Sequence, residues 1–339
     1  MAKLVLGVAT SHGPMLSTPW QQWGQRVEAD KKSKELWYKG KNVSFEELTD
    51  LRRDEKLENE ITPEKMEARH TACQQAIDQL AEVVERVKPD VCVIIGDDQR
   101  ELFHDTNMPA FAVYWGDSFM NQAPTEDELA KMPPGIAIAN WGHSPPEPME
   151  ISGEPKLASK MLSTLIDDEF DISHLNQLPQ GRHEHASIPH AYGFIYRRIM
   201  HDNVPPNVPV FINTFYPPNQ PTLRRSYKLG KSIGKAIREW DSDKTVAVFA
   251  SGGLTHFVVE EDVDEMVLNA FREKDDDALM NMPRDRFNSG TSEIRNWIAL
   301  AGAMSDGDLE MSLVDFQPCY RSIAGTGNAM GFAYWNGAK

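Results

Sequence analysis

Short apolar runs alternate along the chain with longer segments whose apolar residues recur at helical spacing. The runs are rich in Val, Ile and Phe and are flanked by Gly, Pro or Asp, which is typical of buried strands. We predict strands at 3–9, 90–96, 110–116, 208–215, 245–250, 311–316 and 329–335. We predict helices at 155–168, 189–200, 222–240, 262–272 and 292–304. This alternation indicates an α/β fold, with one elaborated domain built on a central mixed sheet flanked by helices.

The first long helix has clear signals at both ends. Thr62 can cap its first turn, and Pro63 suits the first helical position because proline has no amide proton to leave unpaired. Pro89 then ends it. Its apolar face consists of Cys73, Ile77, Leu80, Val83, Val84 and Val87, which recur at steps of three and four residues.

The segment Thr18–Ile61 interrupts the passage from the first strand to this helix. It is rich in charged residues and carries the aromatic residues Trp20, Trp23, Trp37 and Tyr38. We interpret it as a helical insertion that packs over one end of the sheet. Two roles stay open for it, a surface excursion anchored by its aromatic residues, or a lid over a pocket that can also form a subunit contact.

Charge and composition exclude several classes of protein. The 339 residues carry 35 Lys and Arg against 51 Asp and Glu, a formal charge of −16, which argues against a nucleic-acid binder held by phosphate contacts. The longest apolar runs are strand-sized and fall short of the roughly 20 residues that cross a bilayer. The start of the chain enters a strand pattern without a signal peptide, so we expect a cytoplasmic location. Cys73, Cys92 and Cys319 form no disulfide or zinc motif, and we interpret them as reduced packing residues.

Titratable residues follow several of the predicted strands or open helices, which is where open α/β sheets build their sites. Four segments have this placement: 11–14 (Ser-His-Gly-Pro), 96–101 (Gly-Asp-Asp-Gln-Arg-Glu), 251–257 (Ser-Gly-Gly-Leu-Thr-His-Phe) and 288–293 (Asn-Ser-Gly-Thr-Ser-Glu). Each also has an ordinary structural interpretation. In the same order, these are a turn that contains a histidine, an acidic cap of a turn, a glycine turn and the start of a helix. We weigh them together because two or more histidines and one glutamate match the face that holds non-haem Fe(II) with open positions.

A dense histidine stretch lies at 182–193. His183 and His185 would share one side of an extended segment, which fits a metal site, a substrate loop or solvent exposure. His190 follows Pro189 at a predicted helix start, and we expect it to point inward. The positive end of a helix dipole disfavours the cationic imidazole, a useful property for a base or a hydrogen-bond partner.

At these residues the chain resembles the class III (LigB-type) extradiol ring-cleavage dioxygenases, a family that includes protocatechuate 4,5-dioxygenase catalytic subunits and gallate dioxygenases. The resemblance covers most of the chain outside Thr18–Ile61. Its strongest portions are 11–14, 252–256, 292–304 and 325–331. The segments are specific jointly rather than singly. The resemblance implies one LigB-like catalytic domain over 1–339.

The family pattern carries over to individual residues of this chain. By motif, His12 resembles the first iron ligand and Glu293 the carboxylate ligand. His256 resembles the acid/base histidine, and His190 a second active-site histidine that contacts the substrate. The implied cofactor is Fe(II).

One position departs from the family pattern. The remaining iron-binding histidine of the family follows an Asp after the second strand, and here that position is Gln99. An amide oxygen binds a metal more weakly than imidazole does, so iron affinity or metal choice could differ. We expect Gln99 as the ligand, with Asp98, Glu101 or His104 as the alternatives.

The resemblance implies an aromatic ring-opening dioxygenase that inserts O₂ into a small catecholic or phenolic acid next to the vicinal diol. Family substrates often carry a carboxylate, for which Arg is the natural partner. Arg100, Arg182, Arg197 and Arg321 lie near the motifs, and we take Arg100 and Arg182 as substrate-binding candidates. The expected partners are this substrate and O₂, within a homo-oligomer, with or without a small lid subunit.

Gln99 keeps two other functions open. One is a hydrolase or lyase on the same scaffold, with Zn²⁺ or another divalent ion that polarises a carbonyl or activates water. The other is a member of the same family with altered catalysis. In the extreme case it would be a binding subunit that holds little metal. His12, His190, His256 and Glu293 argue against that extreme, because an abandoned site has no physical reason to keep them.

Overall fold

A nine-stranded mixed sheet forms the centre of the computed structural model, which describes residues 1–133 and 135–337. In spatial order the strands are β11 (His256–Val258), β13 (Thr326–Gly337), β1 (Lys3–Thr10), β10 (Thr245–Ser251), β4 (Val91–Gly96), β9 (Asn207–Ile212), β5 (Phe111–Tyr114) and β8 (Ser173–Leu175), with β12 (Leu309–Tyr320) paired to β13. Strands β1, β10, β4 and β9 run parallel, whereas β13 and β5 are antiparallel to β1 and β9. The predicted α/β class with a mixed sheet is confirmed.

Helices cover both faces of this sheet. The α-helices are α1 (Val27–Asp30), α2 (Phe45–Leu51), α3 (Pro63–Val87), α4 (Glu126–Lys131), α5 (Pro155–Asp167), α6 (His190–Phe194), α7 (Leu223–Glu239), α8 (Glu261–Arg272), α9 (Asp276–Asn281) and α10 (Ile294–Met304). Helix α6 continues as a π-helical turn over Ile195–Ile199. Short 3₁₀ helices lie at Pro14–Ser17, Trp20–Arg26, Arg53–Glu55, Leu57–Glu60, Ala137–Gly142, Arg284–Arg286 and Ser289–Glu293. Two small ribbons complete the elements, β2 (Trp37–Tyr38) with β3 (Lys41–Asn42), and β6 (Ser118–Asn121) with β7 (Met149–Ser152).

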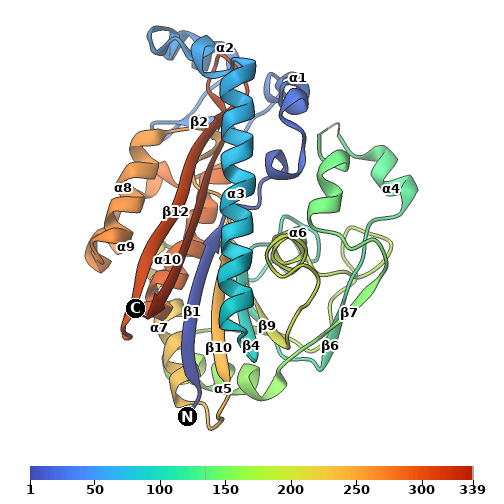
Figure 1. Ribbon diagram of the computed structural model, residues 1–339, viewed down its shortest axis with the longest axis vertical. Helices are drawn as coiled ribbons and strands as arrows, with labels where there is room; N and C mark the ends of the chain where they lie inside the picture. Colours follow the sequence, from blue (N-terminus) through green and yellow to red (C-terminus); the bar gives the residue numbers. More distant parts are fainter. Residues whose placement is uncertain (134, 338–339) are drawn as a thin grey trace.

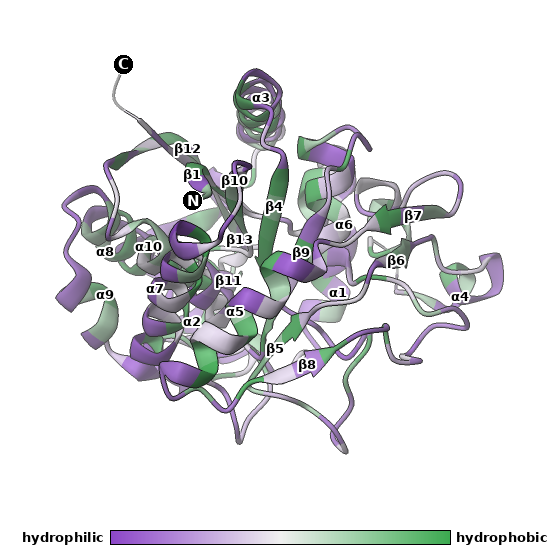
Figure 2. Ribbon diagram, turned by 90° about the horizontal axis from the view of Figure 1, so that it is seen from below, coloured by the Kyte–Doolittle hydropathy of each residue, from purple (hydrophilic) through white to green (hydrophobic). Residues whose placement is uncertain are grey.

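The central strands are buried on both sides, and successive side chains enter different cores. In β4, Val91, Val93 and Ile95 pack with α5, α7 and α10, whereas Cys92 and Ile94 pack with α3 and α6. This alternation follows from the two-residue period of a strand. Figure 2 shows β4 in the hydrophobic colour and the outer helices banded in both colours, as expected of three layers.

Helix α3 begins and ends where the sequence predicts. The hydroxyl of Thr62 accepts a hydrogen bond from the backbone amide of Lys65, and Pro63 is the first helical residue. The helix ends at Val87, where Lys88 adopts a left-handed conformation with φ of 48°. Figure 1 shows α3 lying alongside the long β12–β13 pair.

The insertion Thr18–Ile61 lies beyond one end of the sheet, around α1 and α2 at the top of Figure 1. It contains α1, α2 and short 3₁₀ turns, but also the β2–β3 ribbon, so it is only partly helical. Leu36, Phe45 and Leu48 form a small core with Val258 of β11 and Ala324 between β12 and β13. The insertion therefore packs against the sheet end that carries His256.

The remaining differences from the predicted elements are short ones. Strands β8, β11, β6 and β7 were not predicted, because runs of three or four residues carry too little periodicity. The strand predicted to reach Phe215 ends at Ile212, where the side chain of Asn213 bonds Tyr216 and turns the backbone. Across residues 1–133 and 135–337, the structure has no helix with both the length and the apolar character that crossing a membrane requires.

Candidate active site

The carboxyl ends of three neighbouring parallel strands form the floor of the site. His12 follows β1, Ser251 ends β10, and Asp97 follows β4. These strands are adjacent in the order β1–β10–β4, so their ends meet at one edge of the sheet. All three side chains are buried. Residues far apart in the sequence are thereby brought together, as the strand-end argument predicts.

Two hydrogen bonds fix the tautomer of His12. Ser251 donates its single hydroxyl proton to the carbonyl of Ala191, with an Oγ–O distance of 2.6 Å. The same hydroxyl oxygen lies 3.0 Å from Nδ1 of His12, so it must accept the Nδ1 proton. Burial lowers the pKa of His12 to about 4, against the opposing charge of Glu293. The imidazole is therefore neutral, and its Nε2 presents a lone pair to the site.

Glu293 is the carboxylate at the centre of the site. It ends the 3₁₀ turn before α10 and is 1% exposed. The amide of Gln99 donates to Oε1 and the backbone N–H of Gly253 donates to Oε2, each at 2.8 Å. Burial opposes ionisation, but the charge of His256 and the hydrogen bond from Gly253 hold the pKa of Glu293 well below its usual range. The group is ionised and has two imidazoles beside it.

His256 approaches the same carboxylate from β11. Its Nδ1 donates to the carbonyl of Leu254 at 2.8 Å, and its Nε2 lies 3.4 Å from Oε1 of Glu293. A Cβ atom on Gly253 or Gly290 would come within 2.6 Å of the ring, so only glycine leaves room at these two positions. Burial lowers the pKa of His256, but the charge of Glu293 outweighs it and raises the pKa overall. Gly253 and Gly290, from two of the predicted segments, thus both make room for the ring of His256.

The donor set fits a divalent metal ion. Nε2 of His12 and Nε2 of His256 each lie 3.4 Å from an oxygen of Glu293. Neighbouring donors of an octahedral ion with bonds of about 2.1 Å lie about 3 Å apart. Oδ2 of Asp97 is buried and has no hydrogen-bond partner among the described residues. Ligand atoms of His12, Asp97 and His190 lie within 4.8 Å of one another. Imidazole and carboxylate donors of this kind suit non-haem iron and related metals.

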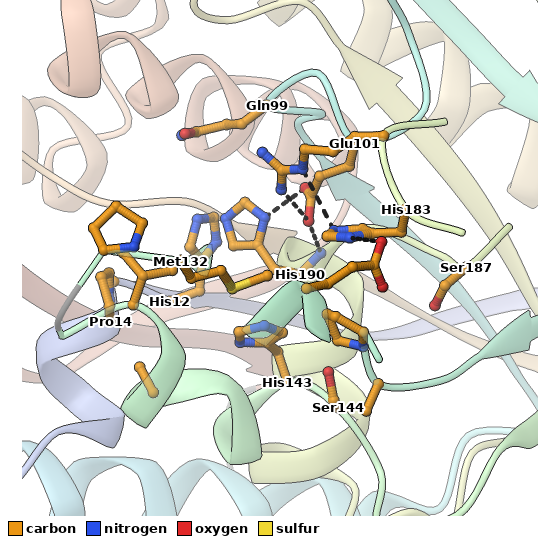
Figure 3. Close-up of a pocket in the computed structure, with 18 of the residues that line it drawn as sticks. His12, Pro14, Gln99, Glu101, Met132, His143, Ser144, His183, Ser187 and His190 are labelled. Carbon is orange, nitrogen blue, oxygen red and sulfur yellow. Dashed lines mark hydrogen bonds and ion pairs between the residues drawn. The ribbon is translucent and has the colours of Figure 1, made fainter. Parts of the chain in front are cut away.

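A second carboxylate and histidine pair forms the adjoining wall (Figure 3). Oε2 of Glu101 lies 2.7 Å from Nδ1 of His190, and Oε1 accepts the backbone N–H of His190 at the start of α6. Burial would lower the pKa of His190, but the charge of Glu101 and this hydrogen bond raise it to about 9. The ring of His190 meets that of His12 edge to face, with centroids 4.7 Å apart. An imidazolium is therefore held next to the neutral His12.

These groups face a cavity of about 570 Å³, within the range of roughly 300–1,000 Å³ typical of small-molecule sites. Its metal-fitting end is formed by His12, His256 and Glu293. Apolar residues line another part, including Met132, Ile136 and Ala139. The cavity therefore has a polar end with metal-binding residue types and a separate apolar part.

The structure brings together most, but not all, of the predicted site residues. His12, Gln99, His190, His256 and Glu293 all line the cavity. Other residues singled out in the sequence that line it are Glu101, Arg182, His183, His185 and Arg321.

Arg100 and Arg182 differ in placement. Arg182 lies at the rim with Nη2 3.6 Å from Oε1 of Glu101. Arg100 turns away with φ of 57°, pairs with Asp105 at 2.7 Å and stacks over Tyr216. Arg100 is not among the residues that line the cavity. Its expected contact with substrate has no support in this geometry.

Several lining residues were missed by sequence reasoning. His143 follows the 3₁₀ turn at Ala137–Gly142, and its ring lies 5.9 Å from that of His190. Burial and the neighbouring His190 lower the pKa of His143 to about 3. Its sequence signal, a histidine between Gly and Ser-Pro, is similar to that of His12. Arg26 also lines the cavity, and no local pattern marks it, whereas Asn328 lies in the family-like segment 325–331 without having been singled out.

The geometry agrees with the comparisons to known proteins. Residues 60–327 match the family model described as the catalytic LigB subunit of aromatic ring-opening dioxygenase. A 2,3-dihydroxyphenylpropionate/2,3-dihydroxicinnamic acid 1,2-dioxygenase of Photorhabdus laumondii is 27% identical over 198 residues, 56% of this chain and 50% of that protein. A gallate dioxygenase of Pseudomonas putida is 28% identical over 124 residues, 36% of this chain and 34% of that protein. The chain thus matches half or less of the length of these relatives.

The matched range contains Gln99, His190, His256 and Glu293, whereas His12 and most of the insertion lie before it. It covers more than half of the chain, which is enough to assign the family. The chain belongs to the LigB family of catalytic subunits of aromatic ring-opening dioxygenases.

Proposed function

We propose that this protein is a non-haem Fe(II)-dependent extradiol dioxygenase that inserts O₂ into a small catecholic acid next to its vicinal diol. The observation that carries the proposal is the ionised Glu293 between Nε2 of His12 and Nε2 of His256, each 3.4 Å away. The two similar relatives are named as dioxygenases of aromatic acids that carry neighbouring hydroxyl groups, which supports the same class of substrate.

His12 and Glu293 would hold the iron, with the amide of Gln99 at the third protein position. The tautomer set by Ser251 supports His12 in this role, because the Nε2 lone pair is free for a metal. Gln99 reaches Glu293 at 2.8 Å, so its amide lies at the edge of the same site. When bound, the iron would supply a centre at which a diol and O₂ are held together.

The chain's own residues would position the diol and move its protons. His256 would accept a substrate proton at Nε2, since Nδ1 already donates to Leu254. His190, charged through Glu101, would present Nε2–H to a substrate oxygen. Arg182 at the rim is the substrate-binding candidate that remains near the cavity. An assembly of several copies stays a prediction of the family resemblance.

Metal content and oxygen uptake test this proposal. Protein purified without oxygen should carry about one iron per chain, consume O₂ with protocatechuate, gallate or a related catechol, and release a yellow ring-opened product. Zinc in place of iron, or iron without oxygen uptake on any diol, would contradict the proposal and favour a hydrolase or lyase on this scaffold.

A further inference from the structure

Arg26 is a cationic residue in the wall of the cavity, and the proposed function gives it no role. It ends the 3₁₀ helix Trp20–Arg26 in the insertion and lines the same cavity as His12 and Glu293. Its Nε and Nη1 atoms are covered, and neither finds a hydrogen-bond partner among the described residues. An uncompensated buried charge is costly, so a native protein that keeps one has a use for it.

Asp30, the carboxylate whose charge acts on Arg26, is already bound by other groups. Both oxygens of Asp30 bind Arg321, at 2.7 Å to Nε and 2.8 Å to Nη2. Oδ2 of Asp30 also accepts the hydroxyl proton of Thr326 at 2.6 Å, and Arg321 donates through Nη1 to Asn328. Asp30 thus neutralises Arg321 and leaves Arg26 as a second guanidinium beside a single carboxylate. The cluster carries a net positive charge next to the cavity.

The stem of Arg26 is held in place from the other side. Gly135 has φ of 82°, and a Cβ atom there would lie 2.9 Å from Cγ of Arg26. The segment that contains Gly135 also provides the apolar lining residues Met132 and Ile136. The guanidinium therefore lies where an apolar wall meets the insertion, and a ring packed on that wall can extend a substituent to it.

The other cations near the cavity have different surroundings. Arg182 is half exposed and lies 3.6 Å from Glu101. Lys131 also lines the cavity but is exposed at the end of α4. Arg26 is the one of these three that combines covered nitrogens with the absence of a partner among the described residues.

We propose that Arg26 forms an anion subsite that binds a carboxylate carried by the aromatic substrate. This inference rests on the proposed function, and it adds which residue selects an acid over a neutral diol. Arg26 and Asp30 precede residue 60, where the family match begins. The matched part of the chain supplies His256 and Glu293 at the metal-fitting end, and the insertion supplies recognition of the anion.

Binding of an acid and its neutral isostere tests the subsite directly. The probes are 3,4-dihydroxybenzoate and its methyl ester, titrated without oxygen into iron-loaded wild type, Arg26→Met and Arg53→Met. Wild type should bind the acid more tightly than the ester. Arg26→Met should weaken acid binding by at least about tenfold and change ester binding less than about twofold. Arg53→Met is the matched control, because Arg53 lies in the same insertion but pairs with Asp50 on the surface.

Several results would overturn the subsite. They are equal affinity of wild type for acid and ester, an equal loss of both in Arg26→Met, or the same acid-specific loss in Arg53→Met. If Arg26→Met fails to fold, Arg26→Lys carries the test. Lysine keeps the charge but not the planar donors, so acid binding should weaken while some preference remains, and wild-type affinity for the acid would overturn the subsite.

Oxygen uptake by the same variants separates this inference from the proposed function. Acid-selective binding that depends on Arg26, in a protein that consumes no O₂ with any diol, would overturn the dioxygenase and support the subsite. Ring cleavage of acid and ester with equal kcat/KM in wild type and in Arg26→Met would support the dioxygenase and overturn the subsite.

Discussion

The cavity contains two groups built from the same residue types, a glutamate with histidines, and they differ in how closely the partners approach. Glu293 has His12 and His256 beside it at 3.4 Å, and its own hydrogen bonds go to Gln99 and Gly253. Glu101 instead contacts His190 directly at 2.7 Å. We call Glu293 with His12 and His256 the open group, and Glu101 with His190 the closed group.

This difference separates a site for an ion from a charged side chain. In the open group, imidazole and carboxylate atoms surround a position without bonding one another tightly, as metal donors do. In the closed group, the carboxylate of Glu101 is hydrogen-bonded to the imidazole of His190 and raises the pKa of His190 to about 9. Burial alone cannot explain the difference, since Glu293 and Glu101 are both buried. The distance between carboxylate and imidazole therefore distinguishes a group that can hold a metal ion from a group that forms a charged histidine.

Removal of the open carboxylate should have the largest effect. Glu293→Ala should lose the metal and at least about a hundredfold of oxygen uptake, because the imidazole of His12 and the amide of Gln99 bind iron weakly without an anionic ligand. Metal analysis of the purified variant checks this. Glu239→Ala, which breaks an exposed pair with Lys160, should keep its iron. Full iron occupancy in Glu293→Ala would remove Glu293 from the ligand set.

Removal of His256, which we propose as the acid/base group rather than a ligand, should leave the metal bound and slow the reaction. His256→Ala should keep about one iron per chain and lose about 10²–10⁴-fold in kcat, the range of a lost general acid and base. Iron content and oxygen uptake are measured on the same sample. His174→Ala, on the exposed strand β8, is the control. Loss of iron in His256→Ala would make His256 a ligand.

The closed group should respond differently from the open one. Glu101→Gln keeps the shape of the side chain but removes the charge that raises the pKa of His190, so the imidazole should titrate at lower pH. We expect roughly a ten- to hundredfold loss of kcat with iron content unchanged. An NMR titration of His190 against pH distinguishes this positioning role from a structural one. An unchanged titration, with activity lost, would contradict it.

The sequence predicts the open group better than the closed one, for a physical reason. His12 and Asp97 follow buried strands, whose apolar runs mark both the strand and its end. Parallel strands in one sheet must then bring those ends together. Glu293 and His256 are marked by glycine-rich segments, and Gly253 and Gly290 are required because the ring of His256 lies against them.

Partners that depend on the packing of separate elements were not predictable. The Glu101–His190 contact joins residues 89 positions apart, and the Asp30–Arg321 pair joins residues 291 apart. No periodicity encodes either contact. Arg100 shows the same limit, because its pairing with Asp105, away from the cavity lining, has no signal in the local sequence. Local pattern fixes strands and their ends, and tertiary packing decides which charges meet.

The smallest expected effect concerns Gln99, the proposed third ligand. Its amide donates to Oε1 of Glu293 at 2.8 Å, so the side chain already lies beside the open group. Gln99→His replaces a weak amide donor by imidazole and should tighten iron binding by about tenfold, whereas Gln99→Ala should weaken it by a similar factor. Competition with a chelator measures both affinities. Equal affinity in wild type and both variants would mean that Gln99 only orients Glu293. Asp97, whose buried Oδ2 has no hydrogen-bond partner within residues 1–133 and 135–337, would then be the candidate for the third ligand.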